Sequence, residues 1–261
     1  MTVSTAIALF VTGVLAGSYG TVVGAGGGFI FVPALLIFFN MEPAIAAGSG
    51  LVIVLINALS GVTGYARQKR INYKAGLQIG IGAVPGSLAG VWLLTFQSSE
   101  STAFYWIFAT ALLSLGIFLF LKNMTSKNKG DMPAAYNQNA EKARLSTKWF
   151  LPLGFFLGIL SSYLGIGGGW VLVPILIYIF RFAAHNAAAT SIFSLCLYTT
   201  TGAFLQSLYG HVDWPTVLWG GLGTIIGAYL GVSLSKKVSS NVVIQMLSML
   251  LVVMGMRLYF G

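Results

Sequence analysis

The sequence contains few charged residues and very few acidic ones. Only 5 of its 261 residues are Asp or Glu and 14 are Lys or Arg, so that 7% of the chain is charged, whereas a soluble globular domain is about 25% charged. Hydrophobic residues make up 57%. This composition disfavours a soluble enzyme and a disordered protein, and it predicts an integral membrane protein that crosses the bilayer several times.

Cysteine and histidine are also scarce. The single cysteine, Cys196, lies in an apolar stretch and has no second cysteine with which to form a disulfide. The two histidines, His185 and His211, lie at the ends of predicted spans. We therefore expect no disulfide framework, no thiol metal site and no cofactor.

The net charge of +9 comes from basic residues in short runs between apolar segments. In a soluble chain such an excess would suggest nucleic acid as a partner, but in a membrane protein basic runs mark cytoplasmic loops. We read them as topology signals. The expected partners are therefore the lipid bilayer and a small substrate, and not nucleic acid.

Apolar windows follow one another along both halves of the chain. The long windows are sufficient to cross about 30 Å of hydrocarbon. The second window of each half is much shorter, and a glycine cluster joins it to the first window: Gly24-Ala25-Gly26-Gly27-Gly28 and Gly165-Ile166-Gly167-Gly168-Gly169. A re-entrant helical hairpin or a broken pair of short helices fits this pattern better than two full crossings. The windows are residues 6–23, 28–40, 44–66, 75–96, 103–121, 149–164, 169–181, 186–208, 215–235 and 242–260.

Residues 123–148 form the one long polar segment. We expect a cytoplasmic linker there, between an N-terminal transmembrane repeat (residues 1–122) and a C-terminal one (residues 149–261). Lys and Arg concentrate in this linker and in the loop from Arg67 to Lys74, as in other cytoplasmic loops. Alternation of the spans then places both termini outside, and only Arg257 among the basic residues falls on the outer side.

The chain repeats itself at an offset of 141 residues. This offset places the first glycine cluster on the second and Val32-Pro33 on Val173-Pro174. Each half then holds one glycine-broken helical hairpin and three transmembrane helices. Because three is odd, the second half starts on the opposite face of the membrane. The predicted fold is an all-α integral membrane protein with two inverted-topology repeats, an arrangement typical of secondary transporters with a substrate site near the midplane.

The two glycine clusters form the predicted substrate site. The short helices after them direct free amides and the positive end of the helix dipole at each break. Two converging breaks would bind an anion without a buried Lys or Arg. Pro33 and Pro174 are expected near the first turn, where a missing N–H is best tolerated. In the competing interpretation, glycines only allow close helix packing, which we favour for stripes such as Gly82 to Gly90.

Polar side chains within the predicted spans complete this site. They are hydroxyls and amides, and no charged residue lies at depth. Asn57 is the most costly of them to leave unpaired. Trp170 either closes over an organic substrate or packs between helices. The predicted substrate-binding residues are Gly24, Gly26, Gly27, Gly28, Ser49, Asn57, Gly165, Gly167, Gly168, Gly169, Trp170, Thr190 and Ser191.

The two G-x-G-G-G-x-x-x-V-P segments, Gly24 to Pro33 and Gly165 to Pro174, resemble those of the TauE/SafE family of sulfite exporters, also known as the toluene-sulfonate uptake permease superfamily. The resemblance covers the whole chain except the linker. It implies a secondary transporter for small sulfur-containing anions such as sulfite, thiosulfate, sulfonates or sulfoacetate, in a prokaryotic cytoplasmic (inner) membrane. It leaves the direction of transport and the number of chains in the assembly open.

Two other functional classes stay open at this point. An anion-selective channel also lines its pore with hydroxyls and glycine backbone. An intramembrane enzyme needs a catalytic pair at depth, whereas the histidines here lie at the rims and the carboxylates in loops. We therefore expect a protein that is not an enzyme.

The predicted orientation is testable by cysteine labelling. In a chain without Cys196, a cysteine at Ser126 or Ser240 should be protected from an impermeant thiol reagent in intact cells, because both lie on the predicted cytoplasmic face. A cysteine at Ser99 should react. Labelling of all three positions from outside contradicts the inverted arrangement.

Overall fold

The computed structural model describes residues 2–96, 101–127, 149–238 and 240–260, and the regular secondary structure of these residues is entirely helical. Six segments are long and apolar enough to span a membrane: α1, α3, α4, residues 104–121 of α5, α8 and α9. The prediction of an all-α integral membrane protein is confirmed. The helices are α1 (Val3–Val23), α2 (Gly28–Phe38), α3 (Pro43–Arg67), α4 (Tyr73–Phe96), α5 (Ser101–Lys127), α6 (Phe150–Leu164), α7 (Gly169–Tyr178), α8 (Ala184–Leu208), α9 (Trp214–Leu234) and α10 (Ser240–Phe260).

The helices follow the predicted windows, with differences in length. α2 and α7 have 11 and 10 residues and each follows a glycine cluster. α1 has 21 residues and is long enough to span a bilayer alone, whereas its repeat equivalent α6 has 15. α5 continues to Lys127, six residues beyond the predicted window, where residues 122–127 contain neither Gly nor Pro. The remainder of the expected linker, residues 128–148, and the labelling position Ser99 lie outside the described residues.

Pro33 and Pro174 lie deeper in their helices than predicted. Each is the sixth residue of its helix and so lies in the second turn. The reason is that each short helix starts at the last glycine of its cluster, with Gly27 or Gly168 as N-cap. Because proline has no N–H, the helix loses one hydrogen bond to the residue four positions earlier.

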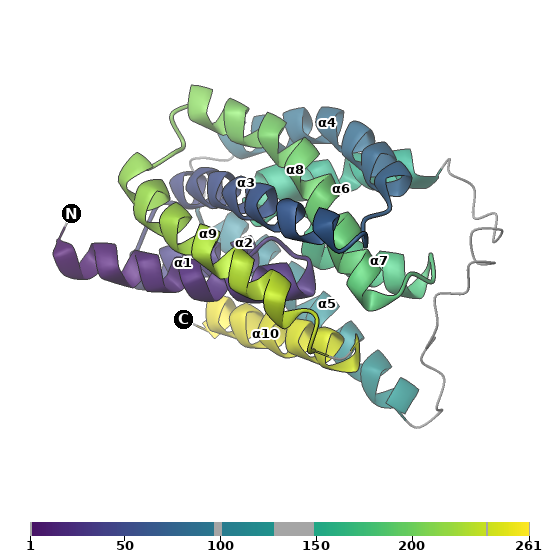
Figure 1. Ribbon diagram of the computed structural model, residues 1–261. Coiled ribbons are helices and arrows are strands. Elements are labelled where there is room, and N and C mark those ends of the chain that lie inside the picture. Colours follow the sequence, from purple (N-terminus) through teal and green to yellow (C-terminus); the bar gives the residue numbers. More distant parts are fainter. Residues whose placement is uncertain (1, 97–100, 128–148, 239, 261) are drawn as a thin grey trace.

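Helices from the two halves pack against one another in pairs. α1 lies along α9 and α6 lies along α4, while α5 packs on α10 and α3 on α8. α3 and α8 occupy the middle of the bundle, where α3 also contacts α9 and α8 contacts α4 (Figure 1). Under the offset of 141 residues, α1 corresponds to α6 and α4 to α9. The packing of one half on the other therefore recurs with the halves exchanged.

The two ends of the bundle differ in charge. Both chain termini lie at one end, and the end of α5 lies with the start of α6 at the other (Figure 1). These are named the terminal end and the linker end. The carboxylates of the described residues, Glu42 and Asp213, lie at the terminal end, before α3 and α9. The linker end carries Arg67, Lys69, Arg70, Lys74, Arg181, Lys236 and Lys237.

Glycine stripes bring the paired helices into backbone contact. A Cβ at Gly86 of α4 would collide with the carbonyl oxygen of Phe155, and one at Gly227 of α9 with that of Val14. Both collisions involve residues related by the offset of 141. Small residues at four-residue spacing permit such close approach in membranes. The same contacts are made by Gly82 on Leu151, Gly90 on Ile159, Gly223 on Phe10 and Gly231 on Ser18.

These contacts predict that Gly86→Ala and Gly227→Ala both destabilise the fold. Each added methyl meets backbone that cannot move aside alone, which typically costs about 1 to 3 kcal/mol, and thermal unfolding in detergent measures the loss. Gly61→Ala is the control, because the nearest atoms to its Cβ would be side-chain atoms of Ile192 and Thr21, at 3.3 Å or more, and not backbone. Unchanged melting temperatures for both stripe variants contradict the packing role.

Candidate functional site

The two glycine clusters meet at the centre of the bundle, and all of their residues are buried. A Cβ on Gly28 would come 2.7 Å from the Cα of Ile166, and one on Gly169 would come 2.8 Å from the Cα of Ala25. Each cluster is therefore in backbone contact with the other. The structure brings the two helix breaks together, as the sequence predicts.

The turns themselves require glycine. α1 ends at Gly24 with φ 85° and α6 ends at Gly165 with φ 72°, a left-handed conformation that strains any residue with a Cβ. The breaks differ at one equivalent position. Gly27 has φ 77° and is restricted to glycine by its backbone, whereas Gly168 has φ −81° and is not.

α3 and α8 enclose the two breaks from either side. Val54 of α3 and Leu195 of α8 each lie against both Gly26 and Gly167, at 2.9 to 3.0 Å from the Cβ that these glycines lack. Nearer the helix starts, Ala188 of α8 contacts Gly24 and Ala47 of α3 contacts Gly165. Any movement of α3 against α8 therefore acts directly on both breaks.

Each short helix directs backbone donors at the break. The amides of Ile30 and Phe31 bond to the carbonyl oxygen of Gly27, and those of Val171 and Leu172 bond to that of Gly168. The amides before them, of Gly28 and Phe29 in α2 and of Gly169 and Trp170 in α7, have no hydrogen-bond acceptor among the described residues. These are the free N-terminal donors that attract anions.

Buried side-chain donors without a partner lie on the helices that form or enclose the breaks, α3, α6 and α7. Asn57 Nδ2, Ser161 Oγ, Ser162 Oγ and Trp170 Nε1 have no partner within the described part of the chain. Asn57 is fixed at its other end, because Thr21 Oγ1 donates to Asn57 Oδ1 at 3.1 Å. Unpaired buried polar groups are rare in folded proteins, so several on the helices at the breaks make this region a candidate site for a ligand or for water.

Ser191 lies between the two clusters. Its hydroxyl donates to the carbonyl oxygen of Gly24 at 2.8 Å and lies 2.9 Å from the Cβ that Gly169 lacks. Tyr198 was not among the predicted residues, yet its hydroxyl accepts from the amide of Gly168 at 3.0 Å. The repeat offers the signal for it, since the offset of 141 residues places Tyr198 on Asn57.

Ser49 and Thr190 have partners away from the clusters. The hydroxyl of Ser49 accepts from the amide of Asp213 at 2.9 Å, and the hydroxyl of Thr190 accepts from the amide of Asn72 at 3.0 Å. These equivalent bonds hold the chain just before α9 and α4. Their predicted contact with substrate stays a prediction.

No charged side chain is buried among the described residues. Arg67 and Arg181 are exposed at the linker end. The donors around the breaks are therefore amides, hydroxyls and an indole.

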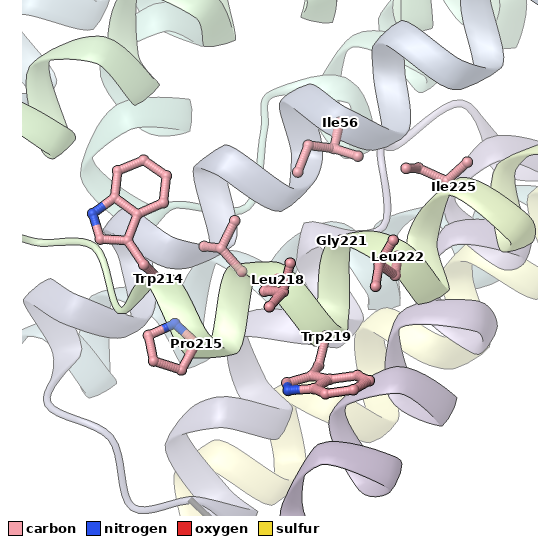
Figure 2. Close-up of a pocket in the computed structure, with 9 residues that line it drawn as sticks. Ile56, Trp214, Pro215, Leu218, Trp219, Gly221, Leu222 and Ile225 are labelled. Carbon is pink, nitrogen blue, oxygen red and sulfur yellow. The ribbon is translucent and has the colours of Figure 1, made fainter.

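A separate apolar groove opens on the outside of the bundle. It is lined by Ile56 of α3 and by residues of α9 that include Trp214, Leu218 and Trp219, which Figure 2 draws as sticks. Trp214 is 60% exposed and Leu218 58% exposed. None of the residues that line this groove is charged, so it is a poor site for an anion. Its apolar lining suits an acyl chain of the bilayer.

Because the two breaks differ at Gly27 and Gly168, we expect the effect of Gly168→Ala on stability to depend on the hydroxyl of Tyr198. Gly168→Ala places a methyl 2.8 Å from the hydroxyl of Tyr198, so it should lower the melting temperature less in a Tyr198→Phe chain than in the wild type. Gly27→Ala is the control, because its strain comes from φ 77° and from contact with Ala16, and it should cost the same in both chains. Equal effects of Gly168→Ala in both chains contradict the contact.

Comparison with known proteins agrees with this architecture. The family model described as sulfite exporter TauE/SafE matches residues 9–258. The chain is 29% identical to the probable membrane transporter protein YunE of Bacillus subtilis, over 97% of both chains, and 30% identical to a probable membrane transporter protein of Methanocaldococcus jannaschii, over 95% of this chain and 93% of the other. No solved structure matches the chain. The protein is a membrane transporter, and it belongs to the TauE/SafE family.

Proposed function

We propose that this protein is a secondary transporter for small sulfur-containing anions, such as sulfite, thiosulfate, sulfonates or sulfoacetate. The anion binds between the two glycine breaks and reaches either side of the membrane by alternating access. The observation that carries the proposal is that two helix N-termini with free amides meet, on helices that also carry buried, unpaired side-chain donors and no buried charge among the described residues.

The donor set suits an anion that must be released again. Each helix N-terminus contributes about half a positive charge, and Asn57 Nδ2, Trp170 Nε1 and the hydroxyls of Ser161 and Ser162 add neutral donors. A buried Arg would bind more tightly but is expensive in the empty carrier. We expect dissociation constants from micromolar to millimolar, which correspond to roughly 4 to 8 kcal/mol.

An inverted repeat supplies the two access states. The support for an inverted repeat is that hydrogen bonds between the halves occur twice, with the donor and the acceptor half exchanged. Ser49 of the first half accepts from the amide of Asp213 of the second at 2.9 Å, and their equivalents at an offset of 141 residues repeat the bond in the other direction, because Thr190 of the second half accepts from the amide of Asn72 of the first at 3.0 Å. A two-fold axis between the halves produces such reciprocal pairs. With the axis in the membrane plane, exchanging the conformations of the halves would close one entrance and open the other.

The charge at the two ends supports an orientation. The basic residues of the linker end lie in the cytoplasm if they follow the positive-inside rule. Both termini then lie outside a prokaryotic inner membrane. The linker end is the entrance for export and the terminal end is the entrance for uptake.

Asn57→Leu tests the site. Sulfite affinity of the purified protein should fall by about tenfold or more, since a hydrogen bond to a charged group contributes about 1.5 to 3 kcal/mol. Thermal stability without ligand should change little, because the substitution removes one unpaired buried donor but leaves the buried Thr21 hydroxyl without its acceptor. Arg67→Gln and Arg181→Gln are the controls, and both should bind sulfite like the wild type. A thermal-shift panel of sulfite, thiosulfate, sulfoacetate and a neutral compound measures these affinities.

Two results would count against the proposal. If a folded Asn57→Leu protein binds sulfite like the wild type, the binding site is not at the breaks. If a folded Arg67→Gln protein loses sulfite binding, the anion is bound by a cationic side chain and not by the helix dipoles. Flux in liposomes separates the carrier from a channel. Sulfite uptake should saturate and should accelerate when sulfite is present on the opposite side, whereas an open pore shows neither property.

A further inference from the structure

α3 and α8 end in the same type of turn, at opposite ends of the bundle. At the end of α3 the amide of Lys69 bonds to the carbonyl oxygen of Ala66 at 3.0 Å and that of Arg70 to Tyr65 at 3.5 Å. At the end of α8 the amide of Gly210 bonds to Ser207 and that of His211 to Gln206. This is the Schellman motif, which folds the residue after the left-handed position back against its own helix.

Arg70 and His211 are the residues folded back, and they are repeat equivalents. His211 finds a partner there, because its Nδ1 lies 2.7 Å from Gln206 Oε1. Arg70 folds back against Tyr65, the equivalent of Gln206, whose hydroxyl is already bonded to the carbonyl oxygen of Thr21. One guanidinium nitrogen of Arg70, Nη1, is consequently buried without an acceptor among the described residues. The turn thus removes part of a cation from water and leaves it unpaired.

The backbone of this turn is strained at Lys69, the residue that places Arg70 against α3. Lys69 adopts φ 55°, where the equivalent position in the second half has Gly210 at φ 75°. A residue with a Cβ is strained in this left-handed conformation, which glycine adopts readily. The chain accepts this strain while holding Arg70 against α3.

The surroundings of Arg70 favour an anion. The guanidinium interacts electrostatically with His185 of α8 and with Tyr65, and the carboxylates of the described residues both lie at the terminal end. The equivalent position at the terminal end is different. Burial lowers the pKa of His211, against the opposing effect of the Glu42 carboxylate, so this imidazole is mostly neutral at pH 7.

We propose that Arg70, with His185 beside it, forms a second oxyanion site at the linker end, in which the transported anion binds before it reaches the glycine breaks. The assignment of the ligand as substrate rests on the proposed function. Guanidinium nitrogens form a fork that matches the oxygens of an oxyanion. Tyr65 connects the two sites, because it contacts Arg70 at the rim and Thr21 one turn before Gly24. Among the described residues of the terminal end there is no equivalent site, because His211, the equivalent of Arg70, is bonded to Gln206.

Equilibrium binding of radiolabelled sulfite tests the second site. The purified wild-type protein in phosphatidylcholine nanodiscs should bind two sulfite ions per chain. Arg70→Gln should bind one, with a loss of about tenfold or more at the second site, which corresponds to about 1.4 kcal/mol. Arg67→Gln is the matched control, because Arg67 is an exposed cation at the same end, and it should still bind two.

The remaining variants separate the two proposals. Asn57→Leu should also bind one sulfite, and Asn57→Leu with Arg70→Gln should bind none. Two ions bound by Arg70→Gln, or equal losses in Arg67→Gln and Arg70→Gln, overturn the second site while leaving the central one intact. Two ions bound by Asn57→Leu count against the central site alone. If phosphatidylglycerol nanodiscs abolish the Arg70 site, its occupant is a lipid phosphate and the entry role is overturned.

Discussion

The structure depends on how backbone polar groups are satisfied at two helix breaks in the middle of a membrane protein. An N–H or C=O group without a partner in hydrocarbon costs several kcal/mol, so a break is tolerated only where protein or a polar ligand surrounds it. Here each break is surrounded by the other one and by α3 and α8. The left-handed caps at Gly24 and Gly165 and the contacts of Val54 and Leu195 follow from this requirement.

The two halves satisfy the requirement in different ways. In the second half Tyr198 accepts a hydrogen bond from the amide of Gly168, and the break is closed by a protein group. In the first half the equivalent side chain, Asn57, accepts from Thr21 and keeps a buried amide nitrogen unpaired. A perfectly symmetric carrier would have two identical half-sites. The two half-sites are therefore not identical: at this equivalent position the first half keeps a free donor, whereas the second half forms a hydrogen bond within the protein.

Much of the fold follows from the sequence because hydrophobic length and glycine spacing act locally. The short helices after each glycine cluster were predictable, and so was the convergence of the clusters, since the repeat relates them. The positions of Pro33 and Pro174 were not, because the sequence does not show which glycine of a cluster starts the helix. Tyr198 escaped notice for a related reason: its bond to Gly168 joins residues on different helices, and no local pattern marks it. Ser49 and Thr190 were predicted to bind substrate because they are hydroxyls within a span. The sequence does not show that each of these hydroxyls accepts a hydrogen bond from a loop amide on another part of the bundle.

The position of the bound anion tests the account most directly. Selenite resembles sulfite in shape and charge, and its selenium atom scatters X-rays anomalously, so crystals soaked in selenite locate the anion without reference to any variant. The account predicts an anomalous peak at the meeting point of the two breaks, within hydrogen-bonding distance of Asn57 and the amides of Gly28 or Phe29. A peak at the exposed rim only, with none between the breaks, would contradict it.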